Sequence, residues 1–333
     1  MYNKLYTRVT HTGQKRAQKG AKMEGLQTIQ AGELSFTDNR LYESFLEFID
    51  VKPKSVETYR TAIRQFLRYL IENGIQNPTR QDIINYREYL KEGHKANTVQ
   101  NYLTAVKIFF AWLELEGIYK NVANKVNGPK ISREHKKGYL TQHQSRRLLE
   151  CVDTSTTAGK RDYAMIGLLL TTGLRTIEVQ RANVGDMDTL GGFTVLYIQG
   201  KGYDDAAKYV KIAEPVEDAI MCYLKSRSDE KPGKDEPLFA SASNHNNGER
   251  MTTRSIRRIV KDSLIRAGYD SDRLSAHTLR HTAATLNLLN GGTLEETQQL
   301  LRHANISTTM IYSHALERAG NKSEERIASG LFS

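Results

Sequence analysis

Apolar residues recur at helical spacing across residues 41–113, and this periodicity constrains the fold more than any other feature of the sequence. Two stripes follow the i, i+3, i+4, i+7 pattern that places side chains on one face of a helix. The first comprises Val56, Tyr59, Ile63, Phe66, Leu67 and Leu70, and the second comprises Val99, Tyr102, Leu103, Val106, Phe109, Phe110 and Leu113. Helices with one apolar stripe must pack on one another, so the segment predicts a compact bundle of about four helices.

The helical period breaks after residue 127, where Gly128 and Pro129 precede a basic run. Glycine and proline interrupt helices, so a domain boundary is expected here. The predicted organisation is a basic N-terminal extension over 1–36, a helical domain over 37–127, a linker over 128–138 and a second domain over 139–333. The extension is either a solvated tail or an arm that touches phosphates. The linker is either a tether or a segment that tracks a DNA backbone through Lys130, Arg133, Lys136 and Lys137.

The second domain combines helices with a short strand pattern. Thr141 and Gln144 have the spacing of a capping box, which marks a helix start, and a buried helix is predicted to end at Gly173. Residues 193–199 alternate in the manner of a strand, and residues 209–212 do so again after a polar turn, which predicts a β-hairpin. The expected fold class is therefore mainly α with a small β-sheet (α+β).

Charge and cysteine content restrict the partners and the compartment. The formal net charge of +10 and the pI of about 9.4 favour a polyanion such as nucleic acid or an acidic membrane surface. The apolar stretch Met165–Leu170 is too short to span a bilayer, and the basic N-terminus lacks the apolar core of a secretory signal. Cys151 and Cys222 form no CxxC pair, so neither a metal site nor a disulfide framework is expected. A cytoplasmic protein without a membrane anchor is predicted.

Four segments of the second domain carry groups suited to phosphoryl transfer, which needs cationic donors, a nucleophile and a proton source. One of these segments places His277 and Arg280 three residues apart, which puts both side chains on one face of a helix. Each segment alone has an ordinary explanation, such as a surface arginine, a buried histidine or a packed tyrosine. In chain order the chemical groups are Arg175, then His277 with Arg280, then His303, then Tyr312.

This order resembles the tyrosine recombinase family, which includes the lambda-type and Xer-type integrases. The motifs that carry the resemblance are Thr172-Gly173-Leu174-Arg175, His277-x-Leu279-Arg280-His281-Thr282, Leu301-x-His303 and Tyr312-Ser313-His314. The resemblance runs from Leu140 to Ala328, and the N-terminal bundle is similar to the family's SAM-like core-binding domain. Gly200-Lys201-Gly202 resembles the hairpin turn that holds the family's catalytic lysine, with Lys208 as an alternative in the same hairpin.

The resemblance implies a role for each matched residue. Tyr312 would attack the scissile phosphate, which leaves a 3′-phosphotyrosyl bond and a free 5′-hydroxyl. Arg175 and Arg280 would hold the non-bridging oxygens, since the guanidinium fork is bidentate and stays charged. Lys201 would protonate the departing 5′-oxygen.

The histidines complete the implied site. His277 and His303 would hydrogen-bond the phosphate, and His277 would help to deprotonate Tyr312, whose ordinary pKa is about 10. Because the phosphotyrosyl link conserves bond energy, strand exchange would need no ATP, metal or other cofactor. The sequence agrees, since it contains neither a P-loop nor a carboxylate cluster with metal-ligand spacing.

A basic helix is the strongest candidate for DNA contact outside this site. Its cations, at helical spacing, are Arg254, Arg257, Arg258 and Lys261. The helix is either a solvated face or an element in the major groove, with some contacts only to phosphate. The resemblance implies double-stranded DNA with inverted-repeat core sites, a clamp formed by the two domains and a tetramer in the synaptic complex. Ile327 and Leu331 give the C-terminal tail one apolar face, which docks either on its own domain or on a neighbouring protomer.

Several functions fit these features. Integration and excision of a mobile element is favoured by the basic extension, and Xer-type resolution of chromosome or plasmid dimers is the alternative. A type IB topoisomerase-like enzyme would share the chemistry but lack the family-like tail. A DNA-binding regulator with an idle site is disfavoured by the intact set of catalytic groups. A nucleoid-associated location is expected, and accessory proteins are left open.

Overall fold

The computed structural model describes residues 39–51, 53–131, 138–198, 208–227, 232–243, 247–312 and 323–332 of the 333-residue chain. The chain divides into two compact units, one ending at Arg133 and one beginning at Glu134, so the division falls within the basic segment 128–138. Within that segment Lys130 is exposed, whereas Arg133, Lys136 and Lys137 lie outside the described residues. The extension over residues 1–36 also lies outside them.

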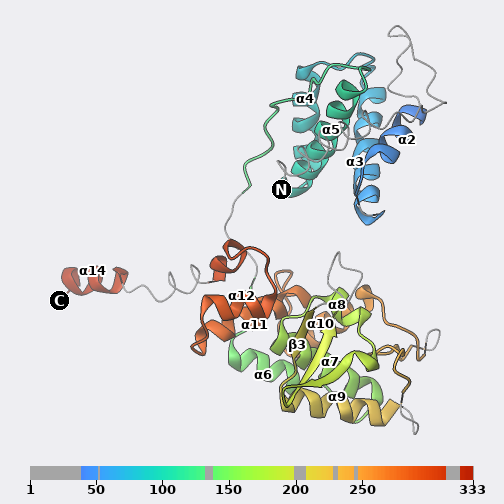
Figure 1. Cartoon of the computed structure of the whole chain (residues 1–333). Helices are drawn as coiled ribbons and strands as arrows, with labels where there is room; N and C mark the ends of the chain where they lie inside the picture. Colours follow the sequence, from blue (N-terminus) through green and yellow to red (C-terminus); the bar gives the residue numbers. More distant parts are fainter. Residues whose placement is uncertain are drawn as a thin grey trace. The chain divides into compact units, whose positions relative to one another are not determined.

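The first unit is a bundle of helices, as the apolar stripes predict. Its described part holds α2 (Asn39–Phe48), α3 (Pro53–Glu72), α4 (Arg80–Gly93) and α5 (Ala96–Leu115), which Figure 1 shows side by side. The backbone N–H of Thr79 donates to the Asp82 carboxylate at 2.8 Å, which caps the start of α4. The core contains many aromatic rings beside its aliphatic side chains. Phe45 and Phe109 meet edge-on at 5.1 Å between ring centroids, and Phe66 and Tyr86 do so at 5.0 Å.

The second unit is built around α7 (Thr157–Thr172), which packs against α9 (Glu214–Arg227) and α11 (Ala276–Leu289) (Figure 1). The capping box predicted at Thr141 forms as expected, and a second one is present at Thr293 before α12. The other helices are α6 (Gln142–Glu150), α8 (Thr176–Arg181), α10 (Thr253–Arg266), α12 (Leu294–Leu301) and α14 (Ser323–Phe332), with a short helical segment over 307–312.

A three-stranded antiparallel sheet in the order β1-β2-β3 completes the second unit. The strands are β1 (Met187–Leu190), β2 (Phe193–Ile198) and β3 (Lys208–Lys211). The predicted hairpin corresponds to β2 and β3, so the α+β class is confirmed. Strand β1 was not predicted. It joins β2 through Gly191 and Gly192, whose φ angles of 58° and 82° suit a tight two-residue turn.

None of the helices in the described ranges is long and apolar enough to cross a membrane.

Candidate active site

Arg280 forms hydrogen bonds to the C-terminal ends of two helices, α7 and α12. Its side chain is only 2% exposed on α11, and its guanidinium donates to the carbonyls of Gly173 and Leu301. Gly173 ends α7 in the left-handed region at φ 59°, and a Cβ there would lie 2.8 Å from Leu301. Glycine is favoured at that point, because the backbone is left-handed and a Cβ would crowd the Leu301 side chain. The motif Gly-Leu-Arg and the arginine of α11 are therefore joined in space, although 107 residues separate Arg280 from Gly173.

Arg175 stands next to this junction, at the start of α8. Its Nη1 lies 2.9 Å from Oε1 of Glu178, and its backbone N–H donates to Oε2 of the same carboxylate at 2.7 Å. Glu178 is 1% exposed, whereas the side chain of Arg175 is 36% exposed. The carboxylate thus caps α8 and holds one edge of the guanidinium, while part of the guanidinium remains open to solvent.

Tyr312 is buried, and its hydroxyl is held by a histidine. The oxygen lies 2.5 Å from Nδ1 of His281, while the ring packs with Leu301 and Ala284. The ring of His281 also meets that of His277 edge-on, with 4.6 Å between centroids. His277 is exposed and His281 is buried. The predicted sites gave no role to His281, although its place four residues after His277 put it on the same helical face.

His303 follows the end of α12 and is fixed by a threonine. Its Nδ1 lies 2.9 Å from Oγ1 of the buried Thr309. Burial, and after it the positive charges of Arg280 and Arg175, lower the pKa of His303 to about 4. The imidazole is therefore neutral at pH 7. If the Thr309 hydroxyl donates to Nδ1, the proton sits on Nε2, which can donate to an anion.

Burial and the local positive field set the protonation states of the neighbouring groups. Burial, followed by repulsion from Arg175 and Arg302, lowers the pKa of Arg280 to about 10, so the guanidinium stays charged at neutral pH. Burial raises the pKa of Tyr312, with Arg280 opposing the shift. The phenol is thus protonated at neutral pH, and a nucleophilic role would require a proton acceptor.

The remaining predicted residues differ in whether the structure describes them and in how exposed they are. Lys201 lies outside the described residues, while Lys208 begins β3 opposite Ile198 and is exposed. The assignment of the catalytic lysine stays a prediction. On α10, Arg254, Arg257 and Arg258 are exposed, but Lys261 pairs with Asp270 at 3.0 Å.

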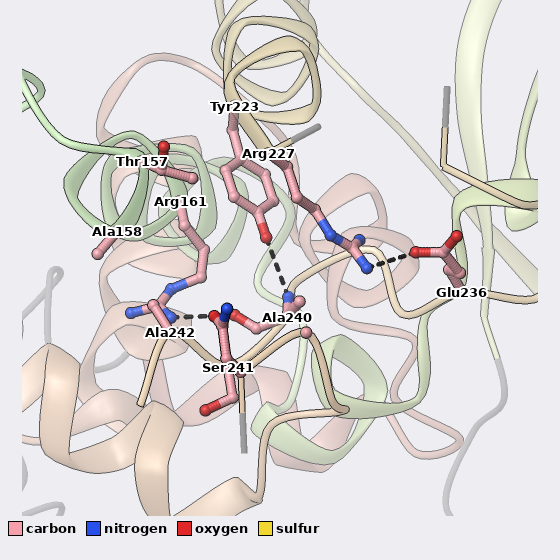
Figure 2. A pocket seen from close by; sticks show the side chains of 11 residues that line it. Thr157, Ala158, Arg161, Tyr223, Arg227, Glu236, Ala240, Ser241 and Ala242 are labelled. Carbon is pink, nitrogen blue, oxygen red and sulfur yellow. Dashed lines mark hydrogen bonds and ion pairs between the residues drawn. The ribbon is translucent and has the colours of Figure 1, made fainter. Parts of the chain in front are cut away.

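A cavity of about 290 Å³ elsewhere in this unit contains none of the predicted site residues (Figure 2). Several of its polar side chains are already engaged. Arg161 donates to the Ala240 carbonyl, the Tyr223 hydroxyl accepts from the Ala240 N–H, and Arg227 pairs with Glu236 at 2.6 Å. Across the described ranges, no group of three His, Cys, Asp or Glu side chains is close enough together to hold a metal ion.

Comparison with known proteins agrees with the motifs. Residues 138–318 match the phage integrase family, and residues 42–117 match the N-terminal SAM-like domain of phage integrases. Tyrosine recombinase XerC of Herpetosiphon aurantiacus is 33% identical over 284 residues, covering 82% of this chain and 89% of that protein. Tyrosine recombinase XerD of Listeria monocytogenes is 30% identical over 287 residues, covering 83% and 94%.

Solved structures share the fold. XerH recombinase bound to a palindromic difH substrate has a TM-score of 0.69 at 22% identity, covering 86% of this chain and 84% of that one. A lambda integrase dimer bound to a COC′ core site has a TM-score of 0.63 at 16% identity, covering 80% and 94%. The Tn1549 transposon integrase in complex with circular intermediate DNA has a TM-score of 0.63 at 20% identity, covering 82% and 94%.

The fold and the family matches define a DNA strand transferase of the tyrosine class. The chain belongs to the phage integrase family and is a tyrosine site-specific recombinase, as the sequence motifs predict.

Proposed function

We propose that this recombinase cuts and rejoins double-stranded DNA through a covalent bond between Tyr312 and a 3′-phosphate. The observation that carries the proposal is the meeting of four segments distant in sequence. The ends of α7 and α12 are joined by Arg280, Arg175 directly precedes α8, and Tyr312 lies against α11. Cationic donors, histidines and a nucleophile thereby share one site.

The residues have distinct tasks in this reaction. The Tyr312 oxygen attacks phosphorus, the P–O5′ bond breaks, and the 5′-oxygen leaves with a proton for which Lys201 is the proposed donor. Arg175 and Arg280 hold the non-bridging oxygens, and His277 and the neutral His303 donate hydrogen bonds. Nδ1 of His281 is positioned to accept the phenolic proton, because the hydroxyl already lies 2.5 Å from it. Attack of the free 5′-hydroxyl on the phosphotyrosine reverses these steps and rejoins a strand.

Contacts beyond the site would come from exposed basic groups. Arg254, Arg257 and Arg258 present three guanidinium groups on one helix, which suits the backbone or bases of a duplex. We place the linker cations Lys130, Arg133, Lys136 and Lys137 across the same duplex. A DNA partner implies a cytoplasmic, nucleoid-associated enzyme.

Assembly would depend on the C-terminal helix α14. Its Ile327, Leu331 and Phe332 are 62%, 72% and 88% exposed, so this short helix leaves its apolar residues uncovered. A helix of this length is not stable alone. We propose that it docks on a neighbouring protomer, which closes a tetramer on two inverted-repeat sites. Removing residues 327–333 should spare binding to one site and weaken cooperative binding to paired sites.

The biological role that we propose is integration and excision of a mobile element, supported by the basic extension over residues 1–36. Resolution of chromosome or plasmid dimers is the second candidate, and the similarity to XerC and XerD favours it. Sequencing of DNA trapped covalently in the source cell separates the two. Cleavage at both ends of one excisable segment supports the first, and cleavage at a single replicon site supports the second.

The chemistry is tested with a nicked duplex that lets the short fragment bearing the free 5′-hydroxyl diffuse away after cleavage. The duplex is first selected from random sequence by binding to the Tyr312→Phe protein, whose ring and fold are retained. The unchanged protein should form an SDS-resistant adduct with the nicked duplex, and Tyr312→Phe should form none. An adduct with Tyr312→Phe would show that another residue is the nucleophile.

A further inference from the structure

Arg302 has a backbone conformation that favours glycine. It caps the C-terminus of α12 at φ 53° and ψ 42°, directly before His303. Among the described residues, the only other non-glycine residue with positive φ is Lys125. The left-handed region costs a residue with a Cβ about 1 kcal/mol or more, which glycine avoids. A strained arginine in an active site therefore indicates a function for its side chain.

The side chain of Arg302 is directed into the protein. It is 8% exposed, and its Nη2 lies 3.1 Å from Oε2 of Glu178, a residue 124 positions earlier in the chain. Its Nη1 donates to the Leu300 carbonyl at 2.7 Å. Glu178 is the same carboxylate that binds Arg175, so one buried acid is shared by two arginines.

The two carboxylate oxygens of Glu178 have different partners. Oε1 binds the guanidinium of Arg175, while Oε2 binds Arg302 and the backbone N–H of Arg175. A free carboxylate favours a two-oxygen grip on a guanidinium. With Oε2 occupied by Arg302, the guanidinium of Arg175 is held through one oxygen only, and its remaining N–H groups stay open for a phosphate.

The charges around Glu178 also indicate that Arg302 assists phosphate binding. A carboxylate beside a phosphate site repels the substrate, and in a buried place this repulsion is weakly screened. Arg302 offsets that charge, so three arginines and one carboxylate leave a positive field for the extra negative charge that develops at phosphorus.

We propose that Arg302 is a positioning residue that acts through Glu178 to present Arg175 to the scissile phosphate. The inference rests on the proposed function, since it assigns Arg175 to phosphate binding. Arg302 itself is not required to touch DNA.

The test compares Arg302→Gly with Arg302→Asn, because both residues accept the left-handed conformation and both remove the charge. Each should slow single-turnover adduct formation on the selected nicked duplex by about 10- to 100-fold. The Kd for that duplex should change by less than about threefold, and the Tm should fall because Glu178 loses a buried partner, although relaxation of the backbone offsets part of the loss. Arg302→Lys, which keeps a charge but not the fork, should recover part of the rate.

A second pair of variants tests the route through Glu178. In a Glu178→Gln background the charge that Arg302 offsets is gone, so adding Arg302→Gly should slow the reaction by less than about threefold. Parental rates for Arg302→Gly and Arg302→Asn would overturn the inference, as would an equal loss with and without Glu178→Gln. If the unchanged protein itself forms no adduct, the proposed function fails and the inference fails with it.

Discussion

In the helical unit the large buried side chains are aromatic and aliphatic, whereas around Tyr312 the catalytic unit buries an arginine, a glutamate and a histidine. Apolar burial is non-directional and stabilises in proportion to the area removed from water. Buried charges instead cost desolvation energy, which is offset only when their partners are in place. We therefore expect substitutions in the helical core to reduce stability alone, whereas substitutions in the charged cluster also reduce the rate of reaction.

The largest effect on stability is expected from Phe109→Ala, because Phe109 is fully buried and its ring meets those of Phe45, Phe110 and Trp112. We expect a loss of about 3–5 kcal/mol in the free energy of unfolding of the helical unit. Trp112 is the single tryptophan, so its fluorescence during urea unfolding follows that unit alone. Hydrogen exchange in α7, in the other unit, should stay unchanged. A loss below about 1 kcal/mol would contradict the account of this core.

The next effect concerns His281, whose substitution should alter the reaction more than the fold. His281→Phe keeps a ring of comparable volume but removes the acceptor at Nδ1, so adduct formation should fall about 100-fold. The rate should also depend more steeply on pH, because hydroxide must then take the phenolic proton. His277→Phe is the matched comparison, because His277 lies one helical turn earlier and its ring contacts that of His281. A steeper pH dependence in the His277 variant than in the His281 variant would assign the proton acceptor to His277.

The sequence predicts most where structure is local. Helical stripes, capping boxes and the β2–β3 hairpin depend on residues within a few positions of one another, and all three are observed. Strand β1 was missed because three of its four residues are exposed, which leaves no buried alternation to detect. The Gly191-Gly192 pair was the signal available for it.

The charged cluster depends on distances that no local pattern encodes. The catalytic motifs could be named from their order, but the pairing of Arg302 with Glu178 depends on how α8 and α12 end relative to each other. Arg302 follows two leucines in an ordinary helix end, and its sequence neighbours give no sign that its side chain is buried. The roles of Lys201 and of the linker cations stay predictions.

A smaller effect separates two cations of α10. Arg258 is exposed, whereas Lys261 is half-buried and pairs with Asp270 and the Ser271 carbonyl. If Arg258 contacts a phosphate, Arg258→Ala should reduce the slope of log affinity against log salt by about 0.9. Lys261→Ala should change the slope less, because its charge is already partly neutralised. Equal slopes for the parent and Arg258→Ala would remove this arginine from the phosphate contacts.

The smallest effect is a pH dependence that His303 confers on the catalytic unit. The pKa of His303 is about 4 in the folded protein and about 6.5 when the chain is unfolded. As pH falls below 6.5, His303 binds a proton in the unfolded state but not in the folded state. The free energy of unfolding therefore decreases progressively down to about pH 4. Because part of the ring is exposed, solvent screening limits the loss to ~1 kcal/mol.

Hydrogen exchange in α11 and α12 at pH 7 and pH 4.5 measures this loss of stability, and His303→Asn should remove the part of the difference that is due to His303. Trp112 fluorescence is the internal control, since the helical unit does not contain His303, and its transition should be the same in both proteins. An unchanged pH dependence in His303→Asn would mean that the positive cluster does not act on this ring.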